Sequence, residues 1–158
     1  MITLLRLSRR TYPAIALSLL TVLFYSCRIT LIPSYDEAIA QQIEALAKEV
    51  DKFYLNMLET TTNDNDGRAY ELFANSYVDI EVELNSILNK NRARPLNENS
   101  TRICEITLEL WIKYKNEHKE DNNLSDGLIK LNRQAFNDLF YAMQVAEAAK
   151  DIVNNPPQ

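Results

Sequence analysis

The sequence contains little glycine, proline, cysteine or histidine, and each shortage narrows what the chain can be. Only two glycines and five prolines occur among 158 residues. That is too few for a fold built from many tight turns, so long uninterrupted helices are expected. Two glycines also exclude a Gly-rich loop that could cradle phosphate groups. With 46% hydrophobic and 25% charged residues, the composition is that of one ordinary globular domain.

The single histidine, His118, and the two cysteines exclude several familiar sites. A Ser-His-Asp triad has no well-placed histidine, and a di-iron bundle needs two Glu-x-x-His motifs. The chain also lacks the Cys-x-x-Cys-His motif of covalently bound haem. We expect His118 to lie on the surface near the end of a helix, where a cation interacts favourably with the helix dipole. We therefore predict no catalytic residue, no metal site, no cofactor and a protein that is not an enzyme.

The acidic residues do not form a recognisable site. Residues 62–67, TNDNDG, are similar to the start of a calcium-binding loop, but Phe73 stands where the last carboxylate ligand would be needed. A solvated turn with acidic N-capping of the following helix is predicted instead. Glu105 and Glu109 share one helix face at i and i+4, which is a common surface arrangement.

The amino-terminal residues combine a basic start with a short apolar run. Arg6, Arg9 and Arg10 precede the run AIALSLLTVLFY over residues 14–25, which is the charge order of a signal peptide. The run is shorter than the roughly 20 residues that a membrane-spanning helix requires. A signal anchor extending from Tyr12 to about Pro33 remains the alternative.

The residues Phe24-Tyr25-Ser26-Cys27 end this run and resemble the lipobox of bacterial lipoprotein precursors. The resemblance implies a cleaved signal peptide over residues 1–26, a lipid such as palmitate carried at Cys27, and a tether over 27–33. It implies a lipid-anchored protein of the bacterial cell envelope. The residue after Cys27 is Arg28, whereas an Asp at this position retains a lipoprotein in the inner membrane of enteric bacteria. The resemblance therefore implies sorting to the outer membrane, with the domain facing the periplasm.

Two other interpretations of the cysteines stay open. Cys27 could be a lone cysteine in an ordinary signal peptide or anchor, or it could pair with Cys104 in a disulfide, which would prevent lipid attachment through sulfur. Cys104 lies in the apolar segment 103–112. We expect it to be a small buried hydrophobic residue.

The predicted mature protein is acidic. Removal of residues 1–26 leaves 14 basic and 22 acidic residues, a net charge of −8. This charge excludes the basic footprint of a nucleic-acid-binding protein. It also argues against a broad electrostatic surface for anionic lipid, which leaves the acyl group as the membrane contact.

Four amphipathic segments predict an all-α fold, an antiparallel up-down-up-down four-helix bundle over residues 34–155 behind the signal peptide. Helices are expected over 35–61, 68–91, 101–118 and 126–153. Ser34 and Glu37 form a capping box for the first, and Ser100 or Thr101, in the sequon Asn99-Ser100-Thr101, should cap the third. A long hairpin that completes its core in a dimer is the alternative.

The predicted core positions repeat at spacings of mostly three and four residues in every segment. They are Ile39, Ile43, Leu46, Val50, Phe53 and Met57 in the first; Tyr70, Phe73, Tyr77, Ile80, Leu84 and Ile87 in the second; Ile103, Ile106, Leu110 and Tyr114 in the third; and Leu128, Leu131, Ala135, Leu139, Ala142 and Ala146 in the fourth. Cys104, Leu108, Trp111 and Ile112 widen the third stripe, and Phe136, Phe140 and Met143 flank the fourth.

Eight tyrosines are the most unusual feature of the composition. Tyr54, Tyr70, Tyr77, Tyr114 and Tyr141 all lie inside predicted helices. Packing at the edge of the core would account for these tyrosines. The more specific hypothesis is that they form a tyrosine-rich surface that binds a partner.

Together these features predict a small membrane-tethered interaction or adaptor protein with an envelope protein partner. A ligand-binding carrier bundle and an inhibitor of the immunity type are alternatives, and an envelope enzyme is the least expected.

Overall fold

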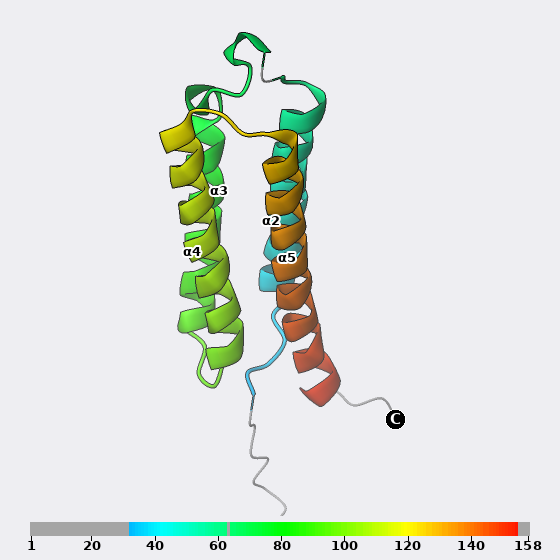
Figure 1. Ribbon diagram of the computed structural model, residues 1–158. Helices are drawn as coiled ribbons and strands as arrows, with labels where there is room; N and C mark the ends of the chain where they lie inside the picture. The colour runs from blue at the N-terminus through cyan, green and yellow to red at the C-terminus, as the bar shows by residue number, and fades with distance from the viewer. Residues whose placement is uncertain (1–31, 63, 155–158) are drawn as a thin grey trace, which may run out of the picture. The chain divides into compact units, whose positions relative to one another are not determined.

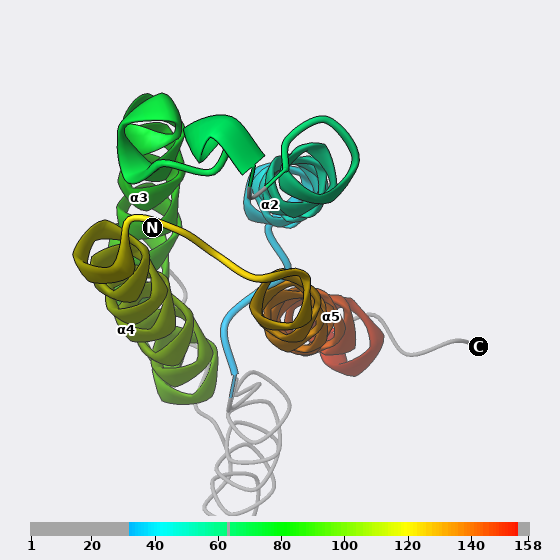
Figure 2. The same ribbon diagram turned by 45° about the horizontal axis from the view of Figure 1, so that its top comes forward.

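The computed structural model describes residues 32–62 and 64–154, which form an all-α four-helix bundle (Figure 1). The helices are α2 (Glu37–Glu59), α3 (Ala74–Arg92), α4 (Glu98–Asp121) and α5 (Asp126–Asn154). They run alternately up and down, and each packs against two neighbours, so that α2 and α4 both contact α3 and α5. Figure 2 shows the resulting ring of four helices. The predicted fold is confirmed, and none of the described helices has the length and hydrophobicity that crossing a bilayer requires.

Helix α2 follows the predicted seam but begins two residues later than predicted. All six predicted positions are buried, from Ile39 to Met57. The N-cap is Asp36, whose carboxylate accepts hydrogen bonds from the amides of Ala38 (3.0 Å) and Ile39 (3.1 Å). The Ser34 capping box is therefore wrong. Ser34 lies outside the helix because its carbonyl accepts a hydrogen bond from Arg94, which holds the chain extended before Asp36.

The connection between α2 and α3 is longer than predicted. It contains two short 3-10 helices, Asp64–Asp66 and Tyr70–Leu72, and α3 starts at Ala74 rather than at residue 68. Phe73 precedes α3 without a side-chain cap, so the expected acidic N-capping is absent there. Gly67 is required by close approach, since a Cβ at this position would lie 2.8 Å from the Thr62 carbonyl oxygen.

Helix α4 differs from the prediction at both ends and in the face that it buries. It begins at Glu98, so the sequon 99–101 lies in the first turn and does not cap the helix. It continues to Asp121 and ends at Asn122 in the left-handed conformation (φ 50°). The buried residues are Ser100, Cys104, Thr107, Trp111 and His118. The predicted stripe lies one residue, or about 100°, around the helix from this face.

In helix α5, too, the buried face differs from the predicted stripe. Ser125 caps it by accepting a hydrogen bond from the Leu128 amide (3.3 Å). The predicted flanking residues Phe136, Phe140 and Met143 form the centre of the buried face, whereas Leu128 and Leu131 are exposed. Large aromatic side chains remove more apolar surface from water than leucine or alanine, so they determine which of two adjacent stripes turns inward.

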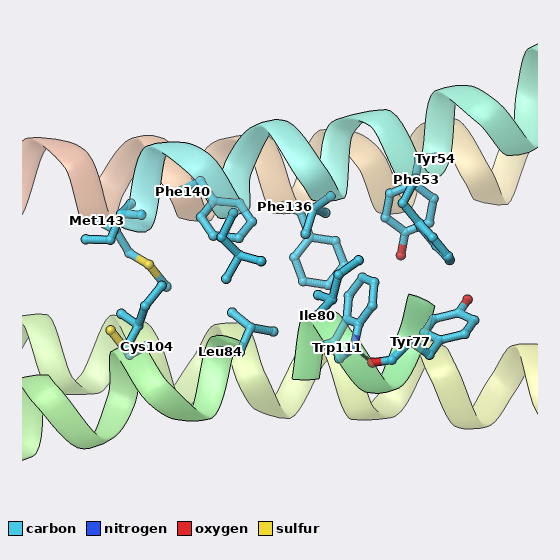
Figure 3. Close-up of a cluster of buried hydrophobic side chains, with 14 of the residues drawn as sticks. Phe53, Tyr54, Tyr77, Ile80, Leu84, Cys104, Trp111, Phe136, Phe140 and Met143 are labelled. Atoms are coloured by element: carbon cyan, nitrogen blue, oxygen red, sulfur yellow. Dashed lines mark hydrogen bonds between the residues drawn. The ribbon is translucent and has the colours of Figure 1, made fainter. Parts of the chain in front are cut away.

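The core contains a cluster of aromatic rings to which all four helices contribute (Figure 3). Its members are Phe53, Tyr54, Tyr77, Trp111 and Phe136, with edge or tilted contacts such as Phe53–Tyr77 (ring centroids 4.9 Å) and Tyr77–Trp111 (5.1 Å). The Trp111 indole nitrogen donates to the Tyr77 carbonyl (3.0 Å), which ties α4 to α3. Phe140, Met143 and Cys104 continue the core toward the opposite end of the bundle (Figure 3).

Candidate functional site

The five tyrosines proposed as a partner surface do not lie together on the surface. Tyr54 and Tyr77 are fully buried, and Tyr70 and Tyr114 are half-buried against the core. Only Tyr141 is well exposed, at 68%. Burial raises the pKa of both Tyr54 and Tyr77 well above the ordinary value. The tyrosine-rich partner surface is therefore wrong, because four of the five rings complete the core or its edge.

His118 is buried, which corrects its predicted surface position. Its Nε2 atom lies 2.7 Å from the Arg68 carbonyl oxygen, and its Nδ1 atom lies 3.0 Å from the Tyr77 hydroxyl. Because a carbonyl oxygen can only accept, Nε2 carries the proton and Nδ1 accepts from the Tyr77 O–H. Burial lowers the pKa of His118, and the Arg68 contact opposes this only partly. The imidazole therefore joins α3, α4 and the 60–73 connection as a neutral ring.

Arg68 anchors the connection that contacts His118. Its guanidinium is buried and donates to the carbonyl oxygens of Met57 (3.1 Å), Thr61 (3.1 Å) and Leu124 (3.1 Å), and to the Asp126 carboxylate (2.6 Å). Three of these partners are backbone carbonyls: Met57 lies in the last turn of α2, where helix carbonyls lack an intrahelical partner, and Thr61 and Leu124 lie in the connections. Arg68 thus joins the end of α2 to the start of α5, which is a structural role.

A second buried polar cluster lies at the end of the bundle where the described chain begins. Glu147 on α5 accepts from both terminal nitrogens of Arg94 (3.1 Å each), from Lys150 (2.5 Å) and from the Asp36 amide (3.0 Å). Burial by itself would raise the pKa of Glu147, but these hydrogen bonds outweigh it and hold the pKa below the ordinary value. The cluster therefore fixes residues 34–36 to α5 and to the α3–α4 turn.

The remaining candidate residues have structural environments. Cys104 is buried as predicted, and burial raises the pKa of its thiol to about 11. Glu105 is bonded to Arg92 (2.8 Å) and Arg102 (3.4 Å) rather than paired with Glu109 for acid-base chemistry. Within the described ranges no group of His, Cys, Asp or Glu side chains could hold a metal ion. Cys27, the proposed lipid attachment site, lies outside the described residues.

An apolar surface runs along the outer side of α4 and α5. On α4 it consists of the predicted stripe, and the Tyr114 ring contacts Phe136 of α5 (centroids 5.9 Å), so the stripe is on the α5 side of α4. Lys115 of α4 pairs with Glu81 of α3 on the other side. The name outer α4–α5 face is used for the exposed Ile106, Leu128, Leu131 and Val145 together with the half-buried residues beside them, Ile103, Leu110, Tyr114, Ala135, Leu139, Ala142 and Ala146. Of the half-buried residues, Ile103, Leu110, Tyr114 and Leu139 pack against the core.

The two sides of α5 differ in chemistry. Arg133 forms a paired salt bridge with Asp51 of α2 (2.6 and 3.2 Å), and a shallow groove between these helices carries Glu37, Glu44 and Lys48. The α2 side of α5 is thus polar, and the α4 side is apolar. Leu131 and Val145 are 60% and 48% exposed, and Ile106 across from them is 39% exposed. Exposed aliphatic residues in an ordered row mark an interaction surface more often than isolated ones do.

Sequence reasoning assigned all residues of the two predicted stripes to the core. Ile103, Leu110, Tyr114 and Leu139 do pack against the core, whereas Ile106, Leu128 and Leu131 are exposed. The signal available was the surplus of apolar residues on α5, where the predicted stripe and the flanking aromatic residues together cover more than one face. A helix with only one buried side needs a single stripe. Comparison with protein-family models, with curated proteins and with solved structures gives no match to this chain.

Proposed function

We propose that this chain is a lipid-anchored protein of the bacterial cell envelope that acts by binding another envelope protein and catalyses no reaction. The signal-peptide pattern and the lipobox-like residues ending at Cys27 support the anchor. The predicted sorting places the domain at the outer membrane, facing the periplasm. The observation that carries the interaction role is the outer α4–α5 face, where Ile106, Leu128, Leu131 and Val145 are exposed next to half-buried apolar residues at the edge of the core.

The proposed partner is an amphipathic helix. The outer face repeats its apolar residues at helical spacing over about 30 Å of α5, the length of a five- to six-turn helix. Ala135, Ala142 and Ala146 are small enough to allow close approach of a second helix. Glu109, Glu117 and Asp138 are exposed. A partner helix with an apolar stripe and basic flanking residues would complement this surface.

Acyl labelling tests the anchor. Cells that express the full chain are fed a palmitate analogue, and the purified protein is assayed for incorporated label. The Cys27→Ser variant should lose the label, and the matched Cys104→Ser variant should keep it, because the Cys104 thiol is buried. Equal incorporation in the Cys27→Ser variant would disprove the lipid anchor.

Site-specific photocrosslinking tests the interaction surface. A photoreactive residue at Val145 or Leu131 of the full chain should yield one discrete heterologous adduct in intact cells. The same residue at Val82, which is 60% exposed on α3, should yield none. Adding Leu131→Glu to the Val145 reporter should abolish the adduct, since a buried unpaired carboxylate is costly. An adduct of two copies of this chain, or equal adducts at Val82, would contradict the proposal.

A further inference from the structure

We infer that the α3–α4 turn, residues 90–102, docks on the surface of a membrane that contains anionic lipid. The inference rests on the proposed membrane anchor and adds a second contact, made by the folded domain itself. Four properties of this end of the bundle support it: its charge, its exposed apolar tip, the position at which the described chain begins, and the cleft between its arginines.

The turn is basic within an acidic domain. From Ile32 onward the sequence contains 13 basic and 22 acidic residues. Residues 90–102 contribute four of the basic residues (Lys90, Arg92, Arg94 and Arg102) and one acidic residue, Glu98. The rest therefore has nine basic and 21 acidic residues. Glu105, Glu147, Asp36 and Glu37 lie at the same end and offset much of this charge. This end is therefore nearer to neutral than the rest of the domain, whose acidic surface is repelled by an anionic membrane.

The tip of the turn is apolar and exposed. Pro95 and Leu96 precede the start of α4, and Leu96 is 52% exposed. Leu96 has a φ of 61°, a left-handed conformation that costs a residue with a Cβ about 1 kcal/mol or more. The chain thus keeps an exposed leucine at a position where glycine or asparagine would be more stable. An exposed apolar side chain beside cations can enter the headgroup region while the cations contact anionic lipid.

The described chain begins beside this tip. Arg94 immediately precedes Pro95, and its guanidinium donates to the Ser34 carbonyl while it is paired with Glu147. The Asp36 amide is bonded to the same carboxylate. Five extended residues span at most about 18 Å, so a lipid on Cys27 would hold the membrane within that distance of Ile32. The anchor would thus keep the α3–α4 turn close to the membrane surface.

The exposed arginines can reach a lipid headgroup. The side chains of Arg92 and Arg102 are 54% and 61% exposed, and both contact Glu105. A shallow cleft between them is lined by Arg94, Pro95, Leu96 and Thr101 and also by Glu98 and Glu105. Arg92 and Arg102 share Glu105, and Arg102 also lies 3.9 Å from Glu109. A guanidinium has five N–H donors, so these contacts still leave donors for phosphate oxygens.

Fluorescence quenching tests the docking. The full chain, purified in detergent, is reconstituted into phosphatidylcholine vesicles with or without phosphatidylglycerol, and the acyl chains carry bromine as a tryptophan quencher. Leu96→Trp is compared with Leu72→Trp, which has similar exposure (66%) in the 3-10 helix at the opposite end of the bundle. The native Trp111 is fully buried and gives the same background in both variants.

We expect strong quenching of Leu96→Trp in vesicles with phosphatidylglycerol and little quenching of Leu72→Trp. Adding Arg92→Gln and Arg102→Gln should lower the affinity of docking about 25-fold, since each cation near an anionic surface contributes about fivefold in affinity. Lys113→Gln with Lys119→Gln, the matched control away from the turn, should leave the quenching unchanged. High salt should reduce it by screening.

The outcomes separate this inference from the anchor. Equal quenching of the two tryptophans, or quenching that does not depend on phosphatidylglycerol, in protein that floats with the vesicles would overturn the docking and leave the anchor intact. If the protein fails to float with either kind of vesicle, as the Cys27→Ser variant is expected to, the anchor and the docking are overturned together. A thermal melt of each variant shows that the domain is folded.

Discussion

The Tyr77 hydroxyl donates a hydrogen bond to Nδ1 of His118 at 3.0 Å, inside the bundle and between α3 and α4. The other ring nitrogen of His118 is bonded to the Arg68 carbonyl (2.7 Å), so both nitrogens are engaged. The single histidine of the chain is therefore part of the core, where protonation would break the bond from Tyr77.

This arrangement predicts a loss of stability in mild acid. Burial lowers the pKa of His118 in the folded state, so below the unfolded value of about 6.5 the unfolded chain binds more protons. The free energy of unfolding should fall as the pH decreases from 7 to 5, by at most about 1.4 kcal/mol per pH unit for one proton. Urea unfolding at several pH values measures the slope. His118→Gln should flatten it, and an unchanged slope would contradict the assignment.

Two tyrosine variants should differ although both rings are fully buried. Tyr77→Phe leaves His118 Nδ1 without its donor and should cost about 1–2 kcal/mol. The Tyr54 hydroxyl has no hydrogen bond of regular geometry among the described residues, although the Asn132 side chain interacts with it and acts to lower its pKa, so Tyr54→Phe should change stability by less than about 0.5 kcal/mol or increase it. The denaturant midpoints of the two variants measure this difference. Equal losses of stability would show that the Tyr77–His118 hydrogen bond makes no specific contribution.

Replacing each of the two glycines by alanine should change stability in opposite directions. Gly67→Ala places a Cβ 2.8 Å from the Thr62 carbonyl oxygen and should destabilise the domain by about 1–3 kcal/mol through backbone displacement. Gly127 lies in the first turn of α5, where the nearest atom to an added Cβ is the Ser125 Oγ at 3.9 Å. Gly127→Ala should therefore stabilise by about 0.5–1 kcal/mol. Thermal denaturation of both variants gives opposite shifts in Tm if the contacts are as described.

Removal of the Glu147 carboxylate should be among the most damaging single changes. Glu147→Ala leaves Arg94 and Lys150 without their shared partner and should cost about 3–5 kcal/mol. Glu109→Ala, at an exposed position of α4, should cost less than about 0.5 kcal/mol. Chemical denaturation measures both. If Glu147→Ala behaves like Glu109→Ala, the cluster does not hold residues 34–36 to α5.

Thiol titration gives an independent test of both cysteines. Burial and a pKa of about 11 make Cys104 unreactive in the folded protein, so a thiol reagent should label it only after unfolding. If Cys27 carries lipid, the denatured mature protein should show one thiol per chain without reductant. Two thiols would indicate an unmodified Cys27, and none would indicate a Cys27–Cys104 disulfide.

The sequence by itself determined the fold class. Scarce glycine and four segments of apolar residues at spacings of three and four predict an antiparallel helical bundle, because each stripe must be covered by another helix. All six predicted core positions of α2, from Ile39 to Met57, are buried, and Tyr54 is the one buried residue of this helix that the predicted stripe did not include. That helix has a single narrow stripe, so periodicity left no choice of orientation.

Only the tertiary structure decided which faces of α4 and α5 turn inward and where the polar residues lie. Both helices have two adjacent apolar stripes about 100° apart, and periodicity cannot rank them. Burial of Trp111, Phe136 and Phe140, with partners for His118 and Glu147, selected one stripe for the centre of the core and left the other half-buried or exposed at its edge. Those partners lie 41 residues away for His118 and 111 for Glu147, a separation that local patterns do not encode.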